Sequence, residues 1–312
     1  LGDPNALAEV AQGVEVLYHC AAENSPRAPA AAFSWVNIAA TENVLNAARH
    51  AGVRRVVHLS CADATLINAD RLNWKETQPM TELPVDALSR SKLLAEELAI
   101  SAISKRLQVC VLRPAWIWGP GDRRTLPALC REAQGGRIGL CGSGENLVPS
   151  VHIDNLLHGL RLADRAEDAN GKIIHVLDAE VQTARELISG FCQSVGLPPP
   201  VRGLYPLSYA RAWLNERLGL PGLCRADVIR RGRSALFDGM AAARELGYTP
   251  IITMPEGLAK LAEWAAAIGG RDVLAQLAPP PATQADIDAL IRLADAQGPA
   301  SQVAEETGPY AR

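Results

Sequence analysis

Short, continuous runs of apolar residues alternate with longer segments of helical periodicity in the first part of the chain. The apolar runs cover 14–22, 53–60 and 107–117. Between them, 33–50 and 85–105 repeat apolar residues at the three- and four-residue spacing of a helix. Strands that are apolar on both faces predict a parallel sheet covered by helices on both sides, with right-handed crossovers. The expected class is therefore α/β, with a doubly wound parallel sheet.

The pattern continues and then changes after residue 195. Further predicted elements are helices over 124–134, 155–163 (with Asp154 as N-cap), 183–195 and 256–268, and a strand over 172–177. A triple proline at 198–200 opens irregular helical pieces that run to residue 218. Prolines at 279–281 predict an extended linker before a short helix over 284–296. We expect a first domain over 1–195, a small, mostly helical substrate or lid region over 196–277, and a linker and tail over 278–312.

Composition excludes several classes of protein. The 312 residues are 48% hydrophobic and 21% charged, as in a folded globular chain rather than a disordered one. A formal net charge of −3 gives no electrostatic footprint for nucleic acid. No apolar run approaches the roughly 18 residues that span a bilayer. Seven cysteines without a CxxC pair predict free thiols in a cytoplasmic protein, and no metal site.

Three segments carry side chains suited to chemistry. In 112–124, a strand ends in a Gly-Pro-Gly turn followed by Asp122, Arg123 and Arg124. Ligands of open parallel sheets bind beyond the carboxyl ends of the strands. The second segment, 88–97, places Lys92 on a helix, and the third, 58–62, is a strand that runs into small residues. Taken singly, each segment also fits a bland interpretation: a turn with solvated charges, a solvated lysine and a plain strand end.

Together, the segments follow the order and spacing of a known superfamily over about residues 1–268. The matching pieces are Leu1–Pro4, Tyr18–Ala22, Asn37–Val44, Gly52–Val57, Ser91–Glu96, Leu112–Asp122, Val151–Asn155 and Ala243–Pro250. The chain resembles the extended short-chain dehydrogenases/reductases, and more narrowly the 3β-hydroxysteroid dehydrogenase and NAD-dependent epimerase/dehydratase branch. The resemblance implies a Rossmann-like domain that binds NAD or NADP and moves hydride at a secondary alcohol or ketone.

The resemblance also implies a catalytic trio. In the family, a Tyr is the general acid/base, a Lys four residues later lowers its pKa and holds the ribose, and a Ser or Thr orients the substrate oxygen. Lys92 matches the Lys, but Leu88 stands at the Tyr position and has no proton to give. Cys61 aligns best with the Ser/Thr position, and a shift of one residue would place Ser60 or Ala62 there.

The family likewise implies which residues surround the cofactor and substrate. The backbone of Ala21 and Ala22 would run alongside the cofactor, and Lys92 would hold the cofactor's ribose. Pro114, Ala115 and Trp116 would lie beside the nicotinamide. Asp122, Arg123 and Arg124 would rim the substrate mouth, and a lid would contain Tyr205, Tyr209 and Trp213.

The beginning of the chain is a second departure from the family. Family members begin with a strand, a glycine-rich turn and a helix, and that turn lets the pyrophosphate approach the backbone. This sequence has no such turn before its first strand, and its glycine-rich segment Gly139–Gly144 precedes no long helix, so we interpret it as a loop. We therefore expect either a fragment of a longer chain or a partner, such as the second copy of a homodimer, that covers the incomplete sheet.

Three functions follow as hypotheses. The first is an NAD(P)-dependent oxidoreductase with a degraded Ser-Tyr-Lys site, acting on a steroid-like, sugar-nucleotide or hydroxy-acid substrate and taking its proton from water or the substrate. The second is a catalytically inactive relative that serves as a scaffold or partner-binding subunit. The third is thiol chemistry at Cys61, with Lys92 lowering the thiol pKa.

Overall fold

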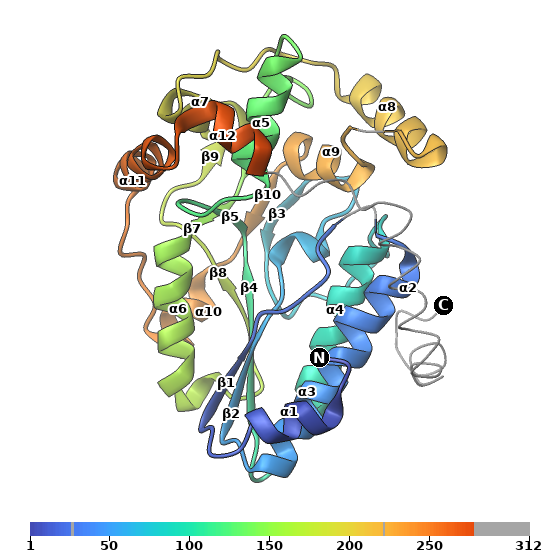
Figure 1. Cartoon of the computed structure of the whole chain (residues 1–312), viewed down its shortest axis with the longest axis vertical. Coiled ribbons are helices and arrows are strands. Elements are labelled where there is room, and N and C mark those ends of the chain that lie inside the picture. Colours follow the sequence, from blue (N-terminus) through green and yellow to red (C-terminus); the bar gives the residue numbers. More distant parts are fainter. Residues whose placement is uncertain (26–27, 221, 278–312) are drawn as a thin grey trace.

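The core of the computed structural model is a parallel sheet. The structure describes residues 1–25, 28–220 and 222–277. Within them, four strands pair in the order β1-β2-β4-β8, all parallel (Figure 1). Their bounds are β1 Val16–His19, β2 Arg55–Leu59, β4 Gln108–Pro114 and β8 Ile173–Val176. The predicted doubly wound α/β fold is confirmed.

Helices cover both faces of this sheet, because its strands are apolar on both sides. Val56, Val109 and Val111 pack in one buried cluster with residues of α3 (Ala40–Ala51) and α4 (Ala87–Ser101). The alternate side chains of the same strands, such as Val57 and Leu112, pack with α6 (Ile153–Arg165) and α10 (Met240–Leu246). Successive residues of a strand point to opposite faces, which accounts for the division.

The helix predicted over 33–50 is present and begins a little earlier. It runs through α2 (Ala30–Phe33), a wider turn with i→i+5 hydrogen bonds over Ser34–Ala39, and α3. A short helix, α1 (Pro4–Val10), packs against α3. Gly52 ends α3 in the left-handed conformation, with φ 73°.

The carboxyl ends of the strands lead into a second cluster of helices and short strands. The apolar run 107–117 is not one strand: it bends at Ala115 and continues as β5 (Trp116–Trp118), which pairs with β7 (Ser150–His152). Helices α5 (Thr125–Gln134), α7 (Ala184–Ser194), α11 (Met254–Ala267) and α12 (Gly270–Leu277) enclose a core around Trp116 and Trp118. Small pairs β3 (Arg71–Trp74) with β10 (Ala235–Phe237) and β6 (Leu147–Val148) with β9 (Gln182–Thr183) complete it.

Two local predictions need correction. Asp154 is not the N-cap of α6, because the helix begins at Ile153, two residues earlier than predicted, and the ring of His152 accepts the capping hydrogen bond. The irregular pieces expected before residue 218 form one regular helix, α8 (Tyr205–Leu218), followed by α9 (Arg225–Gly232). The linker over 279–281 and the helix over 284–296 lie outside the described residues, and the domain boundary at 195 stays a prediction. Among the helices described, none has the length and hydrophobicity to cross a bilayer.

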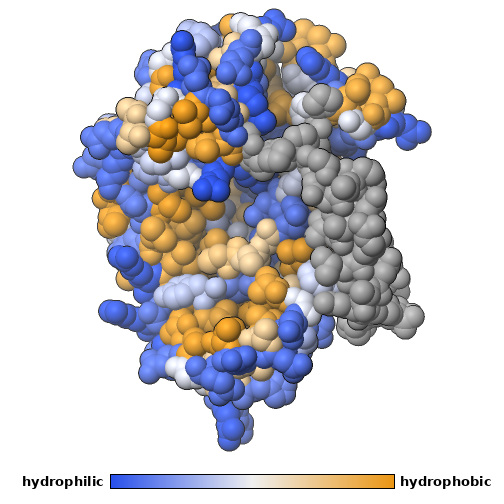
Figure 2. All heavy atoms as spheres, in the orientation of Figure 1, coloured by the Kyte–Doolittle hydropathy of each residue, from blue (hydrophilic) through white to orange (hydrophobic). Residues whose placement is uncertain are grey.

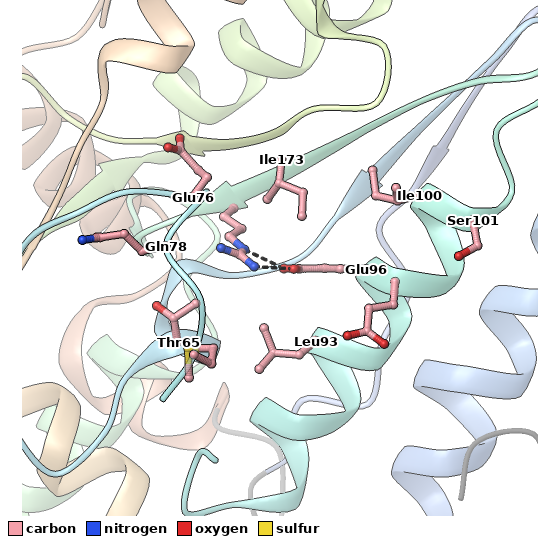
Figure 3. A pocket seen from close by; sticks show the side chains of 11 residues that line it. Thr65, Glu76, Gln78, Leu93, Glu96, Ile100, Ser101 and Ile173 are labelled. Carbon is pink, nitrogen blue, oxygen red and sulfur yellow. Dashed lines mark hydrogen bonds and ion pairs between the residues drawn. The ribbon is translucent and has the colours of Figure 1, made fainter. Parts of the chain in front are cut away.

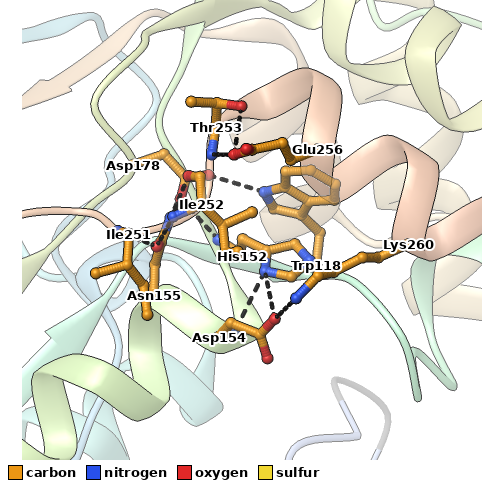
Figure 4. A network of polar contacts seen from close by, with 10 residues as sticks. All are labelled: Trp118, His152, Asp154, Asn155, Asp178, Ile251, Ile252, Thr253, Glu256 and Lys260. Atoms are coloured by element: carbon orange, nitrogen blue, oxygen red, sulfur yellow. Dashed lines mark hydrogen bonds and ion pairs between the residues drawn. The ribbon is translucent and has the colours of Figure 1, made fainter.

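Asp178 joins the sheet to the helices that follow it (Figure 4). Its carboxylate accepts hydrogen bonds from Trp118 Nε1 at 2.8 Å and Ser150 Oγ at 2.9 Å. It accepts two more from the backbone of His152 at 2.8 Å and from Asn155 Nδ2 at 2.7 Å. Asn155 in turn binds the backbone of residues 251–252, just before α11. One carboxylate thus ties β5, β7, α6 and the entry to α11 together.

We expect Asp178→Asn to lower the free energy of unfolding by about 2–4 kcal/mol, because an amide offers one oxygen where four donors now share two. The measurement is the urea midpoint of unfolding. Glu180→Gln is the matched control: this exposed carboxylate makes one long contact, 3.4 Å to Gln182, and its replacement should change stability by less than about 0.5 kcal/mol. Equal midpoints for Asp178→Asn and wild type would contradict the role given to Asp178.

Candidate functional site

The predicted cofactor residues meet at one edge of the sheet. Ala21 and Ala22 follow β1, Ser60 and Cys61 follow β2, and Ala115 and Trp116 follow β4, and these strands are neighbours. Parallel strands end side by side, so the loops that follow them form one surface. Ala21 is exposed, whereas Pro114, Ala115 and Trp116 are buried and offer an apolar wall.

Lys92 reaches this edge from α4. Its side chain is buried, and its Nζ donates to the backbone oxygen of Leu59, the last residue of β2, at 3.4 Å. Burial lowers the pKa of Lys92, and the nearby Cys61, Glu96 and Cys20 side chains oppose that shift. The structure therefore brings together Lys92 and Cys61, two of the residues predicted to be catalytic.

Leu88 lies one helical turn before Lys92 on the same face of α4. Asp86 caps the start of that helix by accepting from the backbone of Ser89 at 2.8 Å, so Leu88 belongs to the first turn. The helix thus places an aliphatic side chain at the position where the resemblance implies a phenol.

Ser60 hydrogen-bonds to one member of a buried ion pair, Glu96 and Arg113. Figure 3 shows Glu96 in its ion pair at the side of α4. The Ser60 hydroxyl donates to Glu96 Oε1 at 2.5 Å, and the guanidinium of Arg113 donates to both oxygens of Glu96, at 2.8 and 2.5 Å. Although burial opposes it, the Glu96 carboxylate raises the pKa of Arg113. Glu96 and Arg113 also line a cavity of about 390 Å³ between α4 and the sheet. The Ser60 hydroxyl therefore donates its proton within this hydrogen-bond network of Glu96 and Arg113.

Cys61, by contrast, keeps its proton at neutral pH. Desolvation raises the pKa of its thiol to about 11, and the opposing effect of Lys92 is smaller. Because the thiolate is the reactive form, the third hypothesis loses its physical basis.

Asn37 is a site residue that our sequence analysis cited only as part of a family motif. It sits in the wide turn before α3 and joins the loop after β1 to α4. Its side chain exchanges hydrogen bonds with the backbone of Glu23, at 2.8 and 3.1 Å, and donates to Ser91 Oγ at 2.9 Å. Asn37 thus fixes the loop that contains Ala21 and Ala22 relative to the helix that carries Lys92.

A second group of charges lies beside Trp116 and was not predicted as a group. Asp63 pairs with Arg230 of α9 at 2.9 Å, and Arg230 also contacts Asp227 at 3.1 Å. Although burial opposes it, these carboxylates raise the pKa of Arg230, whose guanidinium lies 5.8 Å from the ring centroid of Trp116. Sequence spacing could not reveal this pair, because its members are far apart in the chain.

Arg124 lies next to this group, at the start of α5. Desolvation lowers its pKa, and the charge of Arg230 adds to that effect. Asp122, expected on the substrate rim, instead accepts from the backbone of residues 124, 125 and 126. Asp122 is therefore a helix cap. Arg123 and Arg124 are both exposed, and Arg124 is the one that interacts with Arg230.

The residues present fit the nicotinamide half of NAD(P). Lys92 has three N–H donors, and 3.4 Å to Leu59 is its single hydrogen bond within the described part of the chain. That leaves donors for ribose hydroxyls, next to the apolar wall of Ala115 and Trp116. The glycine-rich segment 139–144 leads into the short strand β6 rather than a helix, so its interpretation as a loop is confirmed.

Comparison with known proteins agrees with this geometry. Residues 1–197 match the model of the 3-beta hydroxysteroid dehydrogenase/isomerase family. A 2-alkyl-3-oxoalkanoate reductase of Stenotrophomonas maltophilia is 29% identical over 84% of this chain and 83% of its own. A 4-hydroxy-2-methyl-3-oxo-4-farnesyl-3,4-dihydroquinoline-1-oxide ketoreductase of Stigmatella aurantiaca is 31% identical over 81% of this chain and 78% of its own.

A dTDP-glucose 4,6-dehydratase of Streptomyces venezuelae, solved with NAD bound, has a similar structure: TM-score 0.68, 27% identity, and coverage of 85% of this chain and 77% of that one. A sterol-4-alpha-carboxylate 3-dehydrogenase of Schizosaccharomyces pombe is 28% identical over 73% of this chain and 71% of its own. Because the matched residues 1–197 make up more than half of the chain, the chain belongs to the 3-beta hydroxysteroid dehydrogenase/isomerase family.

Proposed function

We propose that the protein is an NAD(P)-dependent oxidoreductase that interconverts a secondary alcohol and a ketone. The observation that carries the proposal is the buried Lys92 ammonium at the carboxyl ends of β1 and β2. A buried cation that is not paired with a carboxylate is costly, and a ribose would satisfy its remaining donors. The second hypothesis, an inactive scaffold or partner-binding subunit, rests on Leu88, Cys61 and the absence of a glycine-rich turn before the first strand. It is the outcome against which the experiments below are set.

In this proposal the chain's residues bind and orient. Lys92 holds the ribose hydroxyls, the backbone after β1 passes the cofactor, and Pro114, Ala115 and Trp116 pack against the nicotinamide side. When bound, NAD or NADP supplies or accepts the hydride. Both cofactors remain candidates, because the residues that distinguish them in this fold contact the adenosine ribose.

Leu88 has no proton to give, so the proton that moves to or from the substrate oxygen needs another source. Solvent water or the substrate itself would provide it, as expected for an oxidoreductase without the phenol. Cys61 is better placed than Ser60 to orient the substrate oxygen, because its thiol stays protonated and lies near Lys92, whereas the Ser60 hydroxyl is bound to Glu96. A thiol is a weak hydrogen-bond donor. The role that we propose for Cys61 is therefore to position the substrate oxygen, not to transfer a proton to it.

The substrate class that we propose is an apolar molecule with its hydroxyl or ketone near a carboxylate. Two relatives carry such a group in their names, a 3-oxoalkanoate reductase and a sterol-4-alpha-carboxylate 3-dehydrogenase. Arg124 supports the class, because Arg230 is already paired with Asp63 and Asp227 while Arg124 makes no ion pair among the residues described. A substrate whose carboxylate binds Arg124 would point its apolar part toward Trp116.

Lys92→Met should weaken NADH or NADPH binding by at least about tenfold, because it removes the donors for the ribose while keeping the length of the side chain. Isothermal titration calorimetry measures both cofactors against both proteins. Lys105→Met is the matched control: Lys105 is exposed beyond the end of α4, and its loss should leave the dissociation constant unchanged. If neither cofactor binds the wild-type protein, the proposed oxidoreductase function fails and the scaffold hypothesis gains.

Leu88→Tyr should raise the turnover of a 3-oxo acid by about 10²-fold or more, because it places a phenol one turn before Lys92. The rate is followed through NAD(P)H absorbance. Leu88→Phe is the matched control, since it adds the ring without the hydroxyl and should leave the rate at the wild-type value. Equal rates for the Tyr and Phe variants would show that the hydroxyl does not reach the substrate.

Arg124→Gln should raise KM for a 3-oxo acid by about tenfold and leave KM for its methyl ester and kcat unchanged, because only the acid presents an anion. Arg106→Gln is the control, because this arginine is exposed beyond the end of α4, and both KM values are expected to stay at the wild-type level. These constants are measured in the Leu88→Tyr background. An equal rise of KM for acid and ester would mean that Arg124 shapes the site without binding a carboxylate.

A further inference from the structure

Hydrophobic and hydrophilic areas alternate over the face of the molecule in Figure 2, and an apolar area by itself does not specify a ligand. A more specific combination of groups lies in the cavity beside the ion pair of Glu96 and Arg113 (Figure 3). Residues of α4 form one side of this cavity, residues of the segment 65–80 form the other, and Ile173 of β8 lies between them. The volume of about 390 Å³ falls within the range of roughly 300–1,000 Å³ that is typical of small-molecule sites.

Glu76 contributes a buried carboxylate that forms no ion pair with any described lysine or arginine. Its side chain is 9% exposed, and its Oε1 accepts from the backbone N–H of His175 at 2.8 Å. The ring Nδ1 of His175 lies 3.4 Å from the same oxygen, but burial lowers the pKa of this ring to about 3, so the ring is neutral at pH 7. Burial also raises the pKa of Glu76, and the charge of Arg113 opposes that shift only in part. A cation that entered the cavity would therefore stabilise the charged form of Glu76.

Glu97 contributes a second carboxylate, from the α4 side of the cavity. It is half-buried, and its side chain makes no hydrogen bond or ion pair with any residue that the structure describes. Burial raises the pKa of Glu97, and the charge of Glu96 adds to that effect. Glu96 itself is already paired with Arg113. The cavity thus contains two carboxylates whose charge nothing in the described part of the chain compensates.

Arg113 contributes a free hydrogen-bond donor to the same cavity. The residue is 6% exposed and lines the cavity. Its Nε and Nη2 donate to Glu96, whereas its Nη1 has no hydrogen-bond partner among the residues described. Because buried polar groups are seldom left without a partner, we expect an oxygen atom of a ligand to accept from Nη1. This donor points to a ligand independently of the two carboxylates.

Four apolar side chains also line the cavity: Leu93 and Ile100 from α4, Met80 from the opposite side and Ile173 from the sheet. A bare metal ion does not fit this lining, and within the described ranges no group of three or more His, Cys, Asp or Glu residues could hold one. An anionic ligand would be repelled by the two uncompensated carboxylates. The lining therefore fits an organic cation that has both an apolar part and an oxygen acceptor.

We propose that this cavity binds a small organic ammonium ion, a protonated amine with an apolar body and an oxygen acceptor. The ammonium pairs with Glu97 and gains from the charge of Glu76, the oxygen accepts from Arg113 Nη1, and the apolar body packs against Ile100 and Ile173. The occupant contacts the network that also binds Ser60. The inference goes beyond the proposed reaction and does not depend on it, because this binding requires neither cofactor nor turnover.

Isothermal titration calorimetry of the full chain without cofactor tests the proposal. The probes are 2-phenoxyethylamine, which has the ammonium, an ether oxygen and a ring, and 2-phenoxyethanol, in which a neutral hydroxyl replaces the ammonium. We expect the amine to bind and the alcohol to bind at least about tenfold more weakly. A third probe, 3-phenylpropylamine, replaces the ether oxygen with a methylene and should bind about threefold more weakly, because the Arg113 donor then stays unpaired.

Variants locate the amine in the cavity. Glu97→Gln should weaken its binding at least about tenfold, and Glu76→Gln, which keeps an oxygen for the backbone of His175, about fivefold. Ser101→Trp fills the cavity from an exposed lining position and should also weaken binding at least about tenfold. Glu42→Gln is the matched control: it makes the same change of charge at an exposed position of α3 and should leave the dissociation constant unchanged.

Circular dichroism checks that all variants are folded, as expected for the exposed and half-buried positions. The proposal is overturned if wild type does not bind the amine, or if the alcohol binds as tightly as the amine. It is also overturned if Glu97→Gln and Ser101→Trp both bind the amine like wild type, because the amine then lies elsewhere. Since the titration contains no cofactor, such a result is distinct from a failure of NAD(P) to bind.

Discussion

The buried pair of Glu96 and Arg113 fixes the geometry on which the candidate site depends. Arg113 is part of β4, Glu96 is part of α4, and Ser60 follows β2, so three elements meet at one carboxylate. A buried ion pair is tolerated when every donor and acceptor is satisfied, and removal of either partner is costly. Leu88, Lys92 and Glu96 follow one another at four-residue intervals and share a face of α4. The contact that anchors Glu96 therefore also sets where Lys92 reaches the strand ends.

Much of this arrangement follows from local sequence, because periodicity and strand-end chemistry are local properties. The alternating runs predicted the strands and helices around β1, β2 and β4, and the parallel sheet placed Ala21, Ser60 and Ala115 on one edge. The bend at Ala115 was not predicted, since the apolar run continues through it and only the change of pairing partner reveals it. The ion pair of Asp63 with Arg230 and the four hydrogen bonds to Asp178 were not predicted either. Each of these contacts joins residues that are distant in the chain, and local sequence patterns do not reveal such contacts.

In the function that we propose, the site keeps the residues that position cofactor and substrate and has Leu88 where the family resemblance implies a phenol. Lys92, the loop held by Asn37 and the apolar wall at Trp116 bind and orient, and such positioning accounts for a large part of enzymatic rate enhancement. The missing phenol belongs to general acid/base catalysis, which contributes about 10²–10⁴-fold. On the proposed function, Leu88 would lower the rate that the scaffold can support without removing the binding surface. An oxidoreductase with a proton from solvent and a binding subunit that has kept its pocket both fit such a surface, and they differ only in turnover.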